Sequence, residues 1–278
     1  MRPTLAALLS SSFACATTPT DFPVIDVHTH AEFSTTPEPS SGITPTRERY
    51  LAELREIGAS GAVAHTSSSG GSYEDLRAHG VIHCAGVGSE IDTPRLEEGL
   101  ASGRYGCIKV YLGYIHQYAS DPRYEPAYRL AEKYDVPVVF HTGDTYSTRG
   151  KLKYSDPLTL DEVAVDHPNV AFVIAHCGNP WIQSAAEVAY KNPNVYLECS
   201  ALLIGDLEHT PAEQVSRYLV EPIRWIFGYL EDPTKLMFGT DWPLVGMRPY
   251  LEAYRRAIPK QHWRAVFFEN ARRVFHLP

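Results

Sequence analysis

The sequence predicts an α/β protein that forms a single (β/α)8 barrel. Three observations lead to this prediction: short apolar runs alternate with amphipathic segments, eight such pairs follow one another, and no linker interrupts them. The apolar runs contain few polar residues, as expected for parallel strands covered on both faces. A doubly wound open sheet is the alternative fold. It normally has a glycine-rich turn after the first strand, where this chain has His28, Thr29 and His30 instead.

The predicted strands are short runs of apolar and β-branched residues, and they span residues 22–27, 61–64, 81–87, 107–111, 137–140, 170–175, 195–199 and 235–239. The predicted helices carry apolar residues at helical spacing, as Leu51, Leu54 and Ile57 illustrate in the first of them. They span residues 46–58, 73–79, 94–102, 125–134, 159–165, 181–190, 212–229, 248–258 and 262–275. We therefore expect one domain over residues 22–278.

Residues 1–21 precede the first predicted strand as a leader or signal segment. Arg2, a short apolar run and the small-residue site around Ala16 are typical of an export signal, whereas the single basic residue and three serines after the apolar run argue against one. We expect a cytoplasmic protein, with export as the alternative if residues 1–16 are a signal peptide. No apolar run reaches the ~18 residues that a membrane-spanning helix needs.

The composition is that of a globular protein with a net charge of −8. No cluster of Lys and Arg compensates this charge, so we expect no nucleic-acid partner. A homo-oligomer remains compatible with the sequence. Four of the five cysteines lie in or beside apolar strand-like runs, and none forms a C-x-x-C pair. We expect these four to be free, buried thiols rather than disulfides: Cys84, Cys107, Cys177 and Cys199.

Polar side chains end several of the predicted strands, and in an α/β barrel the chemistry lies at these C-terminal strand ends. The residues found there are His28, His30, Lys109, His141, His176 and Asp241. Side chains alternate along a strand, so His28 and His30 point the same way. Four imidazoles and one carboxylate that converge on one mouth can enclose a divalent metal ion, with zinc the first candidate. His65, Tyr111 and His116 lie beside the same strand ends and are candidates for contacting the substrate.

The motifs at these positions resemble those of the amidohydrolase superfamily of metal-dependent TIM-barrel hydrolases. The group most similar includes the aminocarboxymuconate-semialdehyde decarboxylase-like enzymes. The resemblance covers nearly the whole chain from Val24 onward, and it is carried by residues 25–30 (IDVHTH), 140–143 (FHTG), 175–178 (AHCG), 238–243 (FGTDWP) and 270–275 (NARRVF).

The resemblance implies which residues hold the metal. His28, His30, His141 and Asp241 would be ligands, and His176 would be a further ligand or would polarise the substrate carbonyl. Lys109 would either stay unmodified and face the substrate, with one ion bound, or be carboxylated and bridge two ions. We favour the unmodified lysine.

The predicted reaction is metal-assisted hydrolysis of an amide, lactone or related carbonyl bond in a small molecule. Asp241 would be the general base for a metal-activated water, and His176 or the metal would stabilise the oxyanion. The alternative is non-oxidative decarboxylation of an unsaturated or aromatic carboxylic acid. A metal-dependent DNase is less favoured because such relatives tend to carry a glutamate where this chain has Lys109. A non-catalytic metal-binding barrel is less favoured because folding does not require so many strand-end ligands.

Overall fold

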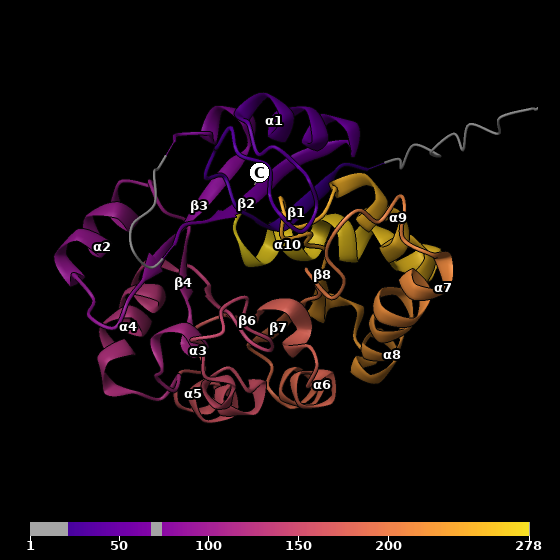
Figure 1. The fold of residues 1–278 in the computed structure, drawn as a ribbon. Helices are drawn as coiled ribbons and strands as arrows, with labels where there is room; N and C mark the ends of the chain where they lie inside the picture. The colour runs from indigo at the N-terminus through magenta and orange to yellow at the C-terminus, as the bar shows by residue number, and fades with distance from the viewer. Residues whose placement is uncertain (1–21, 68–73, 278) are drawn as a thin grey trace, which may run out of the picture.

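The computed structural model describes residues 22–67 and 74–277, and it shows eight parallel strands that pair in chain order and are surrounded by helices (Figure 1). The strands are β1 (Val24–Thr29), β2 (Ala59–His65), β3 (Val81–Val87), β4 (Cys107–Val110), β5 (Val138–Phe140), β6 (Phe172–Ile174), β7 (Val195–Glu198) and β8 (Leu236–Met237). The predicted (β/α)8 TIM barrel is confirmed. The leader at residues 1–21 lies outside the described residues.

The helices that cover the strands are α1 (Arg47–Glu56), α2 (Thr93–Ala101), α3 (Leu112–Ile115), α4 (Glu125–Tyr134), α5 (Leu160–Asp166), α6 (Ile182–Lys191), α7 (Ala212–Val215), α8 (Glu221–Leu230), α9 (Met247–Ala257) and α10 (Asn270–Val274). The expected helix at 73–79 is only a 3-10 turn, Arg77–His79, within the described residues. The expected helix at 212–229 is interrupted by a π-helical turn, Ser216–Val220. In the part of the chain that the structure describes, no helix is long and apolar enough to cross a membrane.

The apolar core has two parts because each strand presents alternate side chains to the inside and the outside of the barrel. The larger part lies between the strands and the helices, and the smaller part fills the barrel interior with residues such as Val63, Val139 and Val173. The C-terminal helix α10 covers the end of the barrel where the strands begin. Asn270 at the start of this helix donates to the backbone oxygen of Leu236 at the start of β8. At the opposite end of the barrel, where the strands finish, long loops connect several strands to the helices that follow them.

A seam of hydrogen bonds joins β1 to the segment around β8. The backbone N–H of Val27 donates to Phe238 O over 2.9 Å, and the N–H of Asp241 donates to His28 O over 2.7 Å. The buried carboxylate of Asp26 accepts from Thr240 twice, from the N–H over 3.0 Å and from the hydroxyl over 2.6 Å. These bonds align the end of the first strand with the turn that follows the last strand.

The prediction of free thiols was wrong, because the structure contains two disulfides, Cys84–Cys107 and Cys177–Cys199. Cys84 on β3 lies directly opposite Cys107 on β4, with the two Cα atoms 4.3 Å apart, so both side chains meet inside the barrel. The second disulfide joins the turn after β6 to the end of β7. The first pairing depends on which residues face each other on neighbouring strands, and the second depends on the turn that carries Cys177 away from β6. Neither feature is readable from one sequence.

These disulfides predict a specific thiol count. In protein folded under oxidising conditions and then denatured without reductant, Cys15 is the only cysteine of the full chain that should react, because the other four are paired. Titration with a thiol reagent should therefore find one thiol before reduction and five after it. Five reactive thiols before reduction would contradict the pairing.

Candidate metal and substrate site

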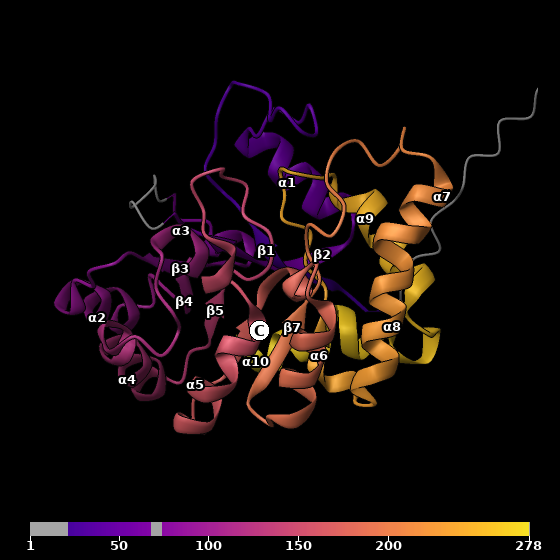
Figure 2. The ribbon, with the colours of Figure 1, turned by 60° about the horizontal axis from the view of Figure 1, so that its bottom comes forward.

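A cavity of about 880 Å³ opens at the C-terminal ends of the strands. Figure 2 shows the long loops that follow β1, β5 and β7 standing on this side of the barrel. The cavity wall includes residues from the ends of several strands, among them His28, Lys109, His141, His176 and Asp241. The residues that the sequence placed at separate strand ends therefore share one cavity.

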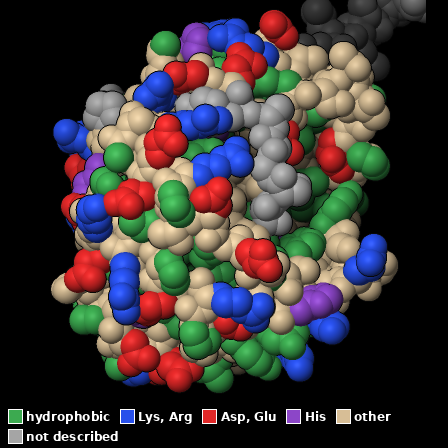
Figure 3. Space-filling model, turned by 90° about the vertical axis from the view of Figure 1, so that its left-hand side faces the viewer, with side chains coloured by type: hydrophobic (Ala, Val, Ile, Leu, Met, Phe, Trp, Pro, Cys, Tyr) green, Lys and Arg blue, Asp and Glu red, His purple; other side chains and the backbone are tan. Residues whose placement is uncertain are grey.

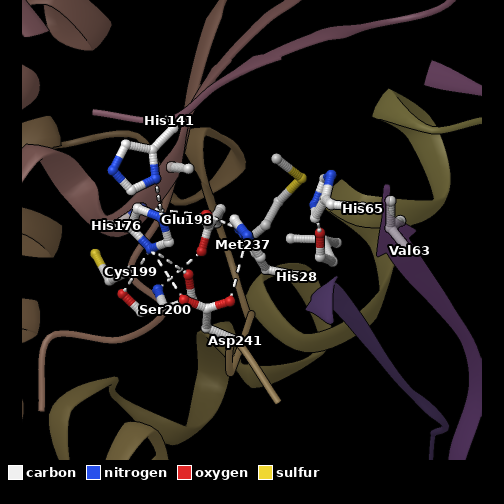
Figure 4. A network of polar contacts seen from close by, with 12 residues as sticks. His28, Val63, His65, His141, His176, Glu198, Cys199, Ser200, Met237 and Asp241 are labelled. Carbon is white, nitrogen blue, oxygen red and sulfur yellow. Dashed lines mark hydrogen bonds and ion pairs between the residues drawn. The ribbon is translucent and has the colours of Figure 1, made fainter. Parts of the chain in front are cut away.

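Three of these residues form a compact buried group at the bottom of the cavity: His28, His176 and Asp241 (Figure 4). One ligand atom from each lies within 4.8 Å of the other two. His28 Nε2 is 3.6 Å from Asp241 Oδ1, and His176 Nδ1 is 3.9 Å from Asp241 Oδ2. Two imidazoles and a carboxylate at this separation could hold a divalent ion such as zinc.

Backbone turns bring two of the three side chains into place. His176 lies beyond the end of β6, in a 3-10 turn, with φ of 59°. Asp241 follows β8 with φ of 69°. Non-glycine residues rarely adopt positive φ values, and such residues concentrate at functional sites, where the surrounding structure holds them. The strand was expected to run to residue 175, but the chain leaves the sheet after Ile174.

His30 and His141 lie beside the three-residue group and each contacts one member of it. His30 Nε2 is 3.0 Å from Asp241 Oδ1, while its other ring nitrogen is 3.2 Å from the backbone oxygen of His65. His141 Nδ1 is 3.0 Å from His176 Nε2, and its Nε2 donates to Asp144 O over 2.8 Å. The structure thus brings all five expected ligands together, with three of them closest.

Lys109 and Tyr111 also line the cavity. The ammonium of Lys109 is completely buried, and it has no hydrogen-bond partner among the described residues. Burial lowers the pKa of Lys109, although the charges of Glu198 and Asp241 oppose the shift. Tyr111 donates its hydroxyl to Thr66 O over 2.8 Å, which fixes its ring in the wall 5.5 Å from Lys109 Nζ.

The other two candidate substrate contacts lie elsewhere. His65 belongs to β2 itself rather than to the loop after it, and its buried ring packs 4.1 Å from the ring of His28, centroid to centroid. His116 lies at the end of α3 with φ of 66°, and its ring nitrogen contacts Arg149 O at 3.0 Å. Neither residue is part of the cavity wall.

Glu198, at the end of β7, is a residue of the site that the sequence did not predict. Its Oε1 accepts from His28 Nδ1 over 2.6 Å and from the backbone N–H of His176 over 3.1 Å, while Oε2 accepts from the N–H of Ser200 over 2.8 Å (Figure 4). This carboxylate fixes the His28 ring so that Nε2 faces Asp241. An acidic residue that ends an otherwise apolar strand was the available signal.

The electrostatics of the group suit a cation. Burial lowers the pKa of His28 well below its usual range and that of His176 to about 4. Burial alone would raise the pKa of Asp241, but contact with His30 and the charges of His176 and Lys109 outweigh it and lower that pKa to about 2. Asp241 Oδ1 also has no hydrogen bond of good geometry. Neutral imidazoles, an ionised carboxylate and an unsatisfied buried oxygen fit a divalent ion.

The model of the Amidohydrolase family matches residues 25–277, so the chain belongs to the amidohydrolase family. Members of this family typically depend on divalent metal ions. No curated protein matches the chain.

Solved structures share the fold at low sequence identity. A probable 2-pyrone-4,6-dicarboxylic acid hydrolase from Acinetobacter baumannii, with citric acid bound, is 15% identical over 92% of this chain and 100% of its own, with a TM-score of 0.66. A 5-carboxyvanillate decarboxylase from Sphingomonas paucimobilis is 14% identical over 92% and 99%, with a TM-score of 0.63. A zinc-bound amidohydrolase from Burkholderia multivorans is 16% identical over 92% and 100%, with a TM-score of 0.64.

Replacing Glu198 with Gln should weaken zinc binding by roughly 10- to 100-fold, because a neutral amide orients and polarises the His28 ring less well than a carboxylate. A competition titration against a chromogenic chelator measures this affinity. Glu187→Gln, which changes an exposed carboxylate on α6, is the matched control. Equal zinc affinity in a folded Glu198→Gln protein would show that this carboxylate does not support the site.

Proposed function

We propose that this protein is a metal-dependent hydrolase that cleaves an amide, lactone or related carbonyl bond in a small molecule. The observation that carries this proposal is the buried group of His28, His176 and Asp241 at the bottom of a cavity of about 880 Å³. Membership of the amidohydrolase family, whose solved relatives include hydrolases by name, supports it. We propose one zinc ion as the cofactor, held by these three residues with His30 and His141 beside them.

A divalent ion at this site would supply Lewis acidity and would lower the pKa of a water molecule toward ~7. Asp241 would accept the proton from the attacking water, and the position of its Oδ1 next to His28 and His30, without a hydrogen bond of good geometry, supports this role. The same carboxylic acid can then return the proton to the leaving group. Asp241 is thus the proposed general base and acid.

His176 and Lys109 are the proposed electrophilic groups. The Nδ1 of His176 is 2.8 Å from the Ser200 hydroxyl, which fixes the orientation of the ring next to the cavity. The Lys109 ammonium reaches the cavity without a partner, so it can donate a hydrogen bond to a substrate oxygen as negative charge develops there. Tyr111 would hold the substrate from the side.

Non-oxidative decarboxylation is the second candidate function. The unpartnered buried ammonium of Lys109 favours it, because such a group could pair with a substrate carboxylate. One of the solved structures with a similar fold is a decarboxylase by name. A screen of lactones and amides against unsaturated and aromatic carboxylic acids distinguishes the two: hydrolysis releases an acid from a neutral compound, whereas decarboxylation releases carbon dioxide.

A nucleic-acid substrate is the less favoured proposal. The net charge is −8, and on the face shown in Figure 3 acidic and basic side chains are interspersed without a continuous basic patch. Phosphate backbones are bound mainly through clustered Lys and Arg. We therefore propose a small molecule as the partner.

Asp241→Asn should lower kcat on a hydrolysable lactone or amide at least ~100-fold, because the amide cannot accept the proton from water. Steady-state kinetics on zinc-loaded protein measure this effect. Chelator-treated wild-type protein should lose activity and regain it with zinc. Metal analysis of the variant separates loss of the base from loss of the ion, and a zinc-loaded variant with undiminished kcat would contradict the proposed role.

Lys109→Ala should leave the metal content at one ion per chain. An unmodified lysine that faces the substrate holds no ion, whereas a carboxylated lysine would bridge two. Elemental analysis of both proteins, purified without chelator, decides between these roles. Two ions in the wild type that fall to one or none in the variant would establish the bridging lysine instead.

A further inference from the structure

We propose that this cavity takes an uncharged substrate, with an apolar or aromatic body, and rejects an analogue that carries a carboxylate at the end away from the reacting carbonyl. This inference rests on the proposed function, because it places the reacting carbonyl beside His28, His176 and Asp241. It concerns the outer part of the cavity wall, which includes none of the proposed catalytic residues. This part is formed by Glu32, Glu38, Tyr114, Asp144, Tyr146, residues 201–204 and Leu244.

The outer cavity wall is largely apolar and aromatic. Ala201, Leu202, Leu203 and Ile204 come from the loop after β7, and Leu244 follows β8. Across the cavity lie Tyr114 and Tyr146, which are linked because Tyr146 N–H donates to the Tyr114 hydroxyl over 2.7 Å. A flat or branched hydrocarbon body would bury apolar surface against both walls.

The charged side chains in this outer part of the cavity wall are all acidic. Glu32 and Glu38 lie in the loop after β1, and Asp144 lies in the loop after β5. Their carboxylates accept from uncharged donors: Glu32 from Ser67 N–H over 3.2 Å, Glu38 from the Tyr146 hydroxyl over 3.1 Å, and Asp144 from Thr145 N–H over 2.8 Å. Among the described residues, none of the three forms an ion pair. Their negative charge is therefore not neutralised by neighbours.

Cations are missing from the described part of this wall. Lys109 is the only Lys or Arg among the described lining residues, and it lies fully buried near Glu198 and Asp241. Arg149 and Lys151, in the loop after β5, are not part of the cavity wall. Residues 68–73 contain neither lysine nor arginine. A carboxylate at the outer end of a substrate would thus lose water next to three like charges with no compensating cation.

The test uses a pair of ligands of nearly the same shape, one neutral and one anionic. Chroman-6-carboxamide and chroman-6-carboxylate have the same ring body, and calorimetry on zinc-loaded protein measures their Kd, with chromatography of the recovered ligand to verify that the carboxamide stays intact. The amide should bind at least ~10-fold more tightly, since each unfavourable 1.4 kcal/mol is about tenfold in affinity. Tighter or equal binding of the carboxylate overturns the inference.

The double substitution of Glu32→Gln with Asp144→Asn should narrow this difference to within about threefold, because it removes two of the three like charges. The matched control is Glu162→Gln with Glu213→Gln, which removes the same net charge from exposed positions on α5 and α7. The control should keep the full difference. A difference that both double variants narrow equally reflects net charge alone and overturns the assignment to the cavity wall.

The corresponding lactones separate this inference from the proposed function. If 2-oxochroman-6-carboxamide is hydrolysed with a higher kcat/KM than its 6-carboxylate, both hold. If the chroman amide binds more tightly than the carboxylate but neither lactone is hydrolysed, the inference that the cavity favours an uncharged ligand holds, and the proposed lactone hydrolysis fails. If the carboxylated lactone is the better substrate, hydrolysis holds and the charge inference fails.

Discussion

The seam between β1 and β8 is the constraint on which the site depends. A barrel closes only if its first and last strands meet in register, and here a single buried carboxylate, Asp26, accepts both the N–H and the hydroxyl of Thr240. The same carboxylate accepts the N–H of His28 over 3.1 Å. Asp26 therefore fixes the backbone on both sides of the seam, one residue before Asp241 and at His28 itself. Without this closure the first and last strands would not present an imidazole and a carboxylate to the same point.

The other half of the site is held from β6 and β7. Glu198 bonds the ring of His28 and the backbone of His176 through the same oxygen, so it couples the β1 side of the site to the turn after β6. The disulfide Cys177–Cys199 joins the residues immediately after His176 and Glu198. A covalent bond and a hydrogen-bond network thus restrain the unusual backbone at His176. Metal ligands held in this way lose little freedom when an ion binds.

The sequence predicted the barrel because a short apolar run and an amphipathic segment are recognisable in each of the eight units. It also predicted that the metal-ligand candidates and Lys109 share one cavity, since the C-terminal ends of parallel strands meet at one mouth. It did not predict the disulfides, because pairing Cys84 with Cys107 requires the register between β3 and β4. His65 was expected in a loop, but β2 extends through it and turns its ring into the barrel interior.

Other differences arise where backbone conformation overrides sequence pattern. His116 was expected above the cavity, but the short helix α3 ends in a left-handed residue that directs this ring toward Arg149 O. Glu198 was missed because a strand-end acid was not distinguishable from a solvated one until its three hydrogen bonds were seen. The three acidic side chains of the outer cavity wall were likewise not predicted, since Glu32, Glu38 and Asp144 come from two loops that are distant in the sequence.

The central claim is that His28, His176 and Asp241 form the centre of a single metal site. Anomalous X-ray diffraction above and below the zinc absorption edge, on crystals of zinc-loaded protein, tests it most directly. We predict one anomalous peak per chain, within coordination distance of all three side chains. A zinc peak bound by other residues, or a fully loaded protein with no peak at this position, would contradict it.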